Sequence, residues 1–103
     1  MITFTEKVYF SENIKERKQE KLRKRLSEGR FSYGYFCITY PSNPENLLDI
    51  IAAGELKYPH YKRSEIKILG LAKGYEEAQE LVRVLIEKIY RETGGFDIGH
   101  YYT

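Results

Sequence analysis

The amino-acid sequence predicts one small domain of the α/β or α+β class, with about four strands in a mixed or largely parallel sheet and about three helices. Three observations lead to this class. The 103 residues suffice for one hydrophobic core and not for two. The hydrophobic period switches repeatedly between two and about 3.6 residues along the chain. The clearest switch lies in residues 65–93, where an apolar run, a glycine turn and a long helical pattern follow one another.

Residues 2–10 predict a half-buried strand. Apolar and polar side chains alternate along this segment, and Glu6 is the one polar residue that interrupts the apolar series. Alternation with a period of two places one set of side chains on the core face of a sheet. The apolar set is Ile2, Phe4, Val8 and Phe10.

Residues 12–28 predict a helix with a thin apolar face. Ser11 is a fair N-cap, and Gly29 stands where a left-handed residue commonly ends a helix. The apolar positions are Ile14, Leu22 and Leu26. Because the helix has little to bury, we expect it at the periphery of the domain.

The charges of this helix divide into two stripes on a helical wheel. The acidic stripe consists of Glu12, Glu16 and Glu20. The basic stripe runs beside the apolar seam and consists of Arg17, Lys18, Lys21, Lys24 and Arg25. Residues 11–30 hold eight Lys/Arg and four Glu, a local net charge of +4, although the whole chain carries only +2. A net charge of this size does not by itself indicate a nucleic-acid binder.

Residues 30–40 form the clearest strand by propensity, because they are largely aromatic and β-branched. Pro41 to Pro44 interrupt that strand. Asn43 as N-cap with Pro44 at the first helical position predicts a short helix, which Gly54 ends. Its apolar residues are Leu47, Leu48, Ile50 and Ile51.

Residues 55–64 have no regular period, and Pro59 excludes a central strand. We interpret them as a surface loop, longer than most connections and therefore of functional interest. The strand that follows is expected to be covered on both faces, because its apolar run does not alternate. That run is Ile66, Ile68, Leu69 and Leu71.

The long helix after this strand has its apolar residues at helical spacing, and Gly94-Gly95 ends it. The apolar residues are Ala78, Leu81, Val82, Leu85, Ile86 and Ile89. Residues 96–102 predict a last short strand. The expected order is therefore strand–helix–strand–helix–strand–helix–strand, which is typical of crossover connections.

Composition excludes several classes of protein. Apolar residues make up 42% and charged residues 31% of the chain, a balance that is ordinary for a globular protein and too apolar for disorder. No apolar run approaches the ~20 residues of a membrane span, and the first residues do not resemble a signal peptide. Cys37 is the one cysteine, which fits a reducing compartment. We expect a cytoplasmic protein without a membrane partner.

The first candidate for chemistry is the turn between Gly70 and Gly74, because a strand, a glycine turn and a helix start can cradle a phosphate. The spacing matches neither the Walker A motif nor GxGxxG. Glu76 and Glu77 also occupy the helix start that an anion would need. We therefore interpret this turn as a packing feature.

The second candidate is nucleic-acid binding by the basic stripe together with the loop 57–63. Cations interleaved with tyrosines neutralise phosphates and stack on bases. The candidate binding residues are Arg17, Lys21, Lys24, Arg25, Tyr33, Tyr35, Tyr58, His60, Tyr61, Lys62 and Arg63.

The sequence contains few candidate residues for enzymatic catalysis. Cys37 lies mid-strand among aromatic residues, where a free cysteine usually behaves as a small buried apolar residue. His60 and His100 lack the paired spacing of metal ligands, and His100 meets Asp97 only if the last strand twists. We therefore predict no catalytic residue, no metal site and no cofactor.

The hypothesis that requires the fewest assumptions about these residues is a non-catalytic module for protein interaction or self-assembly. The chain has ten tyrosines and no tryptophan, and tyrosine and arginine are enriched at protein contacts. Nucleic-acid binding is the alternative. Small-ligand binding or a weakly supported enzyme is the second alternative, and a pocket lined by Tyr33, Tyr35, His60 and Tyr61 would favour the small ligand.

Overall fold

The computed structural model of the chain describes residues 2–30, 33–41, 47–62 and 64–95, apart from the side chain of Lys62. The elements in chain order are β1 (Ile2–Phe10), α1 (Glu16–Ser27), β2 (Tyr35–Thr39), β3 (Asp49–Ala52), the 3-10 helix η1 (Ala53–Lys57), α2 (Pro59–Lys62), β4 (Ile66–Lys73) and α3 (Tyr75–Thr93). The four strands form one mixed sheet in the order β1-β4-β2-β3. β1 is parallel to β4, and β2 is antiparallel to both β4 and β3. The predicted class is confirmed.

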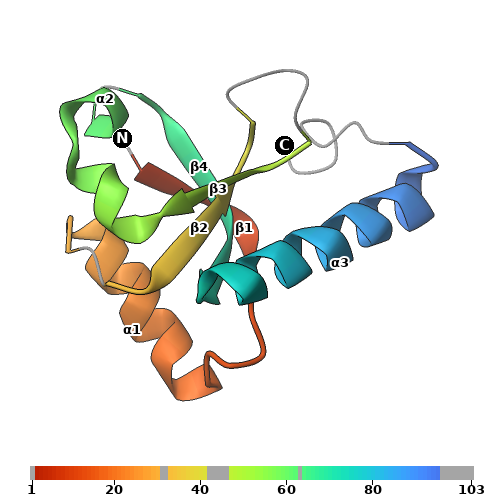
Figure 1. Cartoon of the computed structure of the whole chain (residues 1–103), viewed down its shortest axis with the longest axis horizontal. Helices are drawn as coiled ribbons and strands as arrows, with labels where there is room; N and C mark the ends of the chain where they lie inside the picture. The colour runs from red at the N-terminus through yellow and green to blue at the C-terminus, as the bar shows by residue number, and fades with distance from the viewer. Residues whose placement is uncertain (1, 31–32, 42–46, 63, 96–103) are drawn as a thin grey trace.

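Helices cover both faces of the sheet (Figure 1). Under α1 and η1 lies one apolar cluster, which contains Leu22 and Leu26 of α1 together with Leu56 of η1. Under α3 lies a second cluster, which contains Leu81 and Leu85. Figure 1 shows α1 in orange and α3 in blue on opposite sides of the strands. Within the described ranges, no helix is long and apolar enough to cross a membrane.

β4 lies inside the sheet and contributes to both clusters, as its apolar run predicts. Ile68 and Leu71 face the α1 cluster, whereas Leu69 and Ala72 face the α3 cluster. All four side chains are fully buried. The two-sided burial explains why the run does not alternate with polar residues.

β1 places its predicted apolar set on one face. Ile2, Phe4, Val8 and Phe10 all pack against the α1 cluster. The break that Glu6 marks in the pattern is a bulge, because β1 advances from Phe4 to Tyr9 while its partner β4 advances only from Ile68 to Gly70.

α1 is shorter at its start than predicted and ends as predicted. It begins at Glu16, and Ser11 does not cap it. The Ser11 hydroxyl instead accepts from the Lys73 N–H at 3.1 Å, so this residue ties the end of β1 to the end of β4. At the other end Gly29 has φ +79°, and the Arg30 N–H donates to the Arg25 carbonyl at 2.8 Å. This pattern is a Schellman motif.

The helix predicted over residues 44–53 is wrong, because residues 49–52 form β3. Ile50 and Ile51 face opposite clusters and pair with Ile38 and Cys37 of β2. Short apolar runs fit a strand and a helix equally well, and here the neighbouring strand decides. Its start signal at Asn43 and Pro44 lies outside the described residues.

The interpretation of residues 55–64 as a loop without regular structure is also wrong. η1 and α2 occupy most of this segment, and Leu56 is 1% exposed. Two elements this short, with a single buried leucine in η1, give no periodic sequence pattern from which they could be predicted. Pro59 stands at the first position of α2, where a proline costs no hydrogen bond.

α3 agrees with its prediction. Ala78, Leu81, Leu85 and Ile89 are buried, and Gly94 ends the helix with φ +74°. The last strand predicted over 96–102 lies outside the described residues.

A second bulge lies in β4 at its contact with α3. Ile38 pairs with Gly70, and the next residue, Thr39, pairs with Ile68, so Leu69 is the extra residue. A Cβ on Gly70 would lie 3.2 Å from Leu81 Cδ2 and 3.3 Å from Ile38 Cδ1. The glycine therefore lets α3 approach the bulge closely.

We predict that Gly70→Val destabilises the protein by about 1–3 kcal/mol, because the added methyl groups overfill the contact with Leu81 and Ile38. Urea unfolding followed by circular dichroism measures the change. Gly54→Ala is the control, since a Cβ there meets no atom within 4 Å. Its unfolding free energy should change by less than about 0.5 kcal/mol. Equal destabilisation by both variants would contradict the close approach at Gly70.

Candidate functional site

The basic stripe of α1 is exposed in the folded protein. Leu22 and Leu26 anchor the helix to the sheet. The four candidate cations Arg17, Lys21, Lys24 and Arg25 are all exposed. At about 100° per residue, Arg17, Lys21 and Lys24 lie on the part of the helix turned away from these two leucines, and Arg25 lies at the edge of that part, beside the leucines.

The charges of α1 and α3 are neutralised very differently. On α3, Arg83 pairs with Glu80 and with Glu87, and Lys88 Nζ lies 2.7 Å from a Glu92 carboxylate oxygen. On α1, among the residues that the structure describes, the one ion pair joins Arg23 to Glu20 at 3.7 Å. None of the four candidate cations pairs with a described carboxylate. α1 therefore presents a positive charge that its own carboxylates do not offset.

Arg23 has a structural role. Its guanidinium lies 5.3 Å from the centre of the Phe4 ring, so the side chain packs α1 onto β1. Because of this contact, Arg23 differs in role from the four exposed cations.

η1 and α2 place part of the predicted loop on the same face of the sheet as α1. Leu56 shares its apolar cluster with Leu22 and Leu26, although about thirty residues separate them in sequence. Beside Leu56, Tyr58 is 53% exposed, and Lys57 Nζ lies 5.7 Å from the centre of its ring. The tertiary structure thus brings α1 and η1, which directly precedes the exposed Tyr58, to one face of the sheet.

The remaining predicted tyrosines divide between surface and core. Tyr33 is fully exposed in the turn before β2, and Tyr35 is half-buried against the α1 cluster. His60 and Tyr61 lie on α2, with their ring centroids 5.1 Å apart. Arg63 and the side chain of Lys62 lie outside the described residues.

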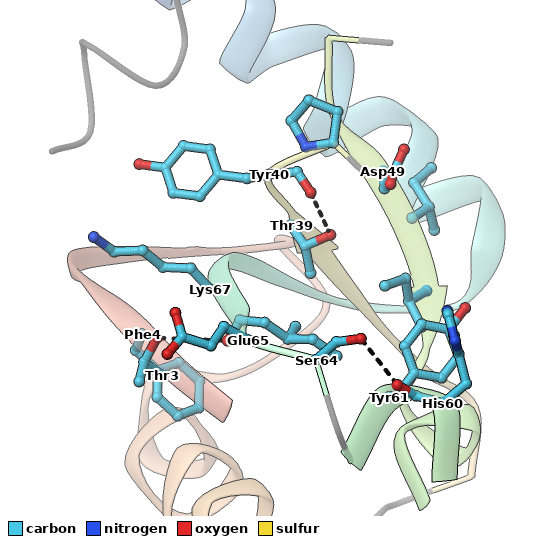
Figure 2. A pocket seen from close by; sticks show the side chains of 14 residues that line it. Thr3, Phe4, Thr39, Tyr40, Asp49, His60, Tyr61, Ser64, Glu65 and Lys67 are labelled. Atoms are coloured by element: carbon cyan, nitrogen blue, oxygen red, sulfur yellow. Dashed lines mark hydrogen bonds between the residues drawn. The ribbon is translucent and has the colours of Figure 1, made fainter. Parts of the chain in front are cut away.

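A pocket of about 760 Å³ opens at the end of the sheet where β4 begins and β2 ends (Figure 2). β4 pairs with β1 as far as Ile66, but its pairing with β2 stops at Ile68. Pro41 follows shortly after and has no N–H for a further ladder bond. The sheet therefore forks here, and the pocket occupies the fork.

His60 and Tyr61 are the two predicted site residues in this pocket. Tyr33 and Tyr35 are not among its lining residues, since they lie toward the other end of β2. The polar lining that sequence reasoning missed is Thr3, Thr39, Asp49, Ser64, Glu65 and Lys67. These residues come from separate segments of the chain, so no single sequence motif contains them. Only Glu65 and Lys67 were noticeable in the sequence, as the charges at the start of the β4 apolar run.

Of the candidate catalytic groups that the structure describes, His60 lines the pocket and Cys37 does not. Cys37 is fully buried in β2, and burial raises the pKa of its thiol to about 12. His60 lies on the surface helix α2, and Asp97 and His100 lie outside the described residues. Within the described ranges, no three His, Cys, Asp or Glu residues gather to hold a metal ion.

The glycine turn before α3 uses its backbone donors internally. The Gly74 N–H donates to the Gly34 carbonyl at 2.8 Å, and the Lys73 N–H donates to the Ser11 hydroxyl. These bonds join β4 to the segments before β2 and after β1, which supports the interpretation of the turn as a packing feature.

In comparisons with known proteins, no family model, no curated protein and no solved structure matches the chain. The site must therefore be interpreted from its own chemistry.

We predict that Cys37 resists thiol reagents in the native protein. A thiol with a pKa of about 12 is about one part in ten thousand thiolate at pH 8. Labelling with dithionitrobenzoate should therefore be slow in buffer and rapid in urea. The control is Ser27→Cys in a Cys37→Ala background, because Ser27 is exposed on α1. Native Cys37 reacting as fast as this surface thiol would contradict its burial.

Proposed function

We propose that the protein is a binding module that holds single-stranded nucleic acid along the basic stripe of α1. The observation that carries the proposal is the charge imbalance of this helix: four exposed cations lack carboxylate partners among the described residues, whereas α3 pairs its cations internally. Unpaired surface cations gain most from meeting phosphates, because each contact releases condensed counterions.

The stripe is unfavourable for the helix itself. Arg17, Lys21 and Arg25 follow one another at four-residue spacing, where like charges destabilise a helix by a few tenths of a kcal/mol per pair. α1 also has only two buried residues to stabilise it. A polyanion along this face would reverse the repulsion, which supports a binding role for these charges.

The stripe is long enough to contact a few consecutive phosphates of a nucleic-acid strand. A rise of about 1.5 Å per residue spreads positions 17–25 over about 12 Å, whereas each strand of B-form DNA has one phosphate per about 3.4 Å of helix axis. The flank with Glu16 and Glu20 would repel a second strand. A single strand can follow the cations alone.

Tyr58 supports a single strand over a duplex. Its ring is half exposed beside Lys57, on the same face of the sheet as α1. Unpaired bases stack on such rings without regard to sequence. We therefore expect binding with little sequence preference.

A protein partner and self-association, which the sequence favours, stay predictions. An acidic protein segment would meet the same four cations but would gain nothing from stacking on Tyr58. Oligonucleotide binding therefore distinguishes the two kinds of partner.

We predict that a fluorescein-labelled 12-nucleotide single strand binds with an affinity that falls steeply between 50 and 300 mM KCl. Replacing Arg17, Lys21, Lys24 and Arg25 by Gln should lower the magnitude of the log K against log salt slope by about 3, since each single-strand contact contributes about 0.7. Fluorescence anisotropy measures both slopes. An affinity that does not change with salt concentration, or that the four substitutions do not lower, would overturn the proposal.

The matched control neutralises three cations of α3, Arg83, Lys88 and Arg91, each by Gln. These residues lie on the helix that covers the other face of the sheet and pair with carboxylates of their own helix. Their loss should leave the salt slope unchanged.

We predict that Tyr58→Ala weakens binding of the same oligonucleotide by about 1–3 kcal/mol, because one base loses its stacking partner. Tyr58→Phe keeps the ring and should bind like the parent protein. Anisotropy titrations at a single salt concentration compare the three proteins. Equal loss in both variants would show that the hydroxyl, and not the ring, makes the contact.

A further inference from the structure

The pocket at the fork of the sheet presents several hydrogen-bond acceptors. The Thr39 hydroxyl donates to the Tyr40 carbonyl at 3.2 Å, and the Thr3 hydroxyl donates to the Ile66 carbonyl at 3.5 Å. Each hydroxyl has thereby used its only proton and keeps acceptor lone pairs. The carboxylates of Asp49 and Glu65 add oxygens that accept only.

The described lining also holds donors, namely the hydroxyls of Tyr40 and Tyr61, the imidazole of His60 and the ammonium of Lys67. Lys67 Nζ lies 5.8 Å from the centre of the Tyr40 ring, to one side of the pocket (Figure 2). Among the described lining residues, Asp49 and Glu65 each carry a carboxylate and Lys67 carries an ammonium, which gives a formal net charge that is negative. Glu65 is exposed and forms no ion pair with any described cation. The pocket therefore favours a ligand that donates hydrogen bonds and carries positive charge.

Much of the remaining lining is apolar or aromatic. Phe4, Ile51, Tyr61 and Ile66 contribute side chains that are partly or fully buried in the α1 cluster. The volume of about 760 Å³ falls among those of small-molecule sites, which span about 300–1,000 Å³. A ligand with an apolar body fits this surface better than a fully hydrated ion does.

From this arrangement we infer that the pocket binds small primary amines with an apolar or aromatic body, the ammonium group meeting the carboxylate of Glu65. The ring or alkyl body lies against Phe4 and Tyr61. This site is separate from the basic stripe of α1, and neither proposal depends on the other.

Three probes of the same shape test the charge requirement: benzylamine, benzyl alcohol and benzoate. Each is titrated into 15N-labelled protein at 150 mM salt, and amide shifts are followed by two-dimensional NMR. Benzylamine should shift the amides of Tyr61, Glu65, Ile66 and Lys67 in a saturable manner, benzyl alcohol should bind more weakly, and benzoate weakest of all. Equal binding of the three, tighter binding of benzoate, or shifts confined to other surfaces would overturn the inference.

The variant Glu65→Gln tests the residue assignment. It keeps the size of the side chain and removes the charge, so benzylamine should bind about fivefold more weakly, while benzyl alcohol binding stays unchanged. Glu55→Gln is the matched control, because Glu55 is an exposed carboxylate of η1 that does not line the pocket. The NMR spectrum of each variant shows directly that it is folded. Loss of benzylamine binding in both variants, or in neither, would overturn the role of Glu65.

Discussion

The structure depends on the burial of β4 on both of its faces. Ile68 and Leu71 hold the layer of α1 and η1, and Leu69 and Ala72 hold α3. β1 and β2 pair with the two edges of β4. Because burial of apolar surface stabilises by about 25 cal/mol per Å², a strand that is buried on both faces stabilises both layers at once. The bulge at Gly70 lets α3 lie close to this strand, and the pocket opens where its pairing with β2 stops.

The two long helices use this support differently. α3 has a wide apolar arc, and its cations form ion pairs with carboxylates of the same helix. α1 has two anchoring leucines and a stripe of cations at repulsive spacing. Nothing in the packing of α1 requires Arg17, Lys21 or Arg25 to be basic. Stability accounts for the ion pairs of α3, whereas we propose a polyanionic partner for the surface of α1.

The sequence predicted the elements whose period extends over many residues and missed the short ones. The apolar run of β4, the arc of α3 and the glycine at position 29 are local signals, and each prediction is confirmed. β3 was predicted as a helix because Leu47 to Ile51 carry no period that tells the two apart. At the candidate site, the basic stripe was visible in the sequence. The pocket was not, because His60 and Tyr61 meet Asp49 and Glu65 only in the folded chain.

By itself, the sequence determined the class of the fold, the two-sided burial of β4 and the separation of charge on α1, because each follows from spacing within one segment. The tertiary structure alone decided three further features. It made residues 49–52 a strand through pairing with β2, placed Tyr58 on the same face as α1, and opened the pocket at the fork. These features depend on contacts between residues far apart in the chain, and the pattern within a single segment does not record such contacts.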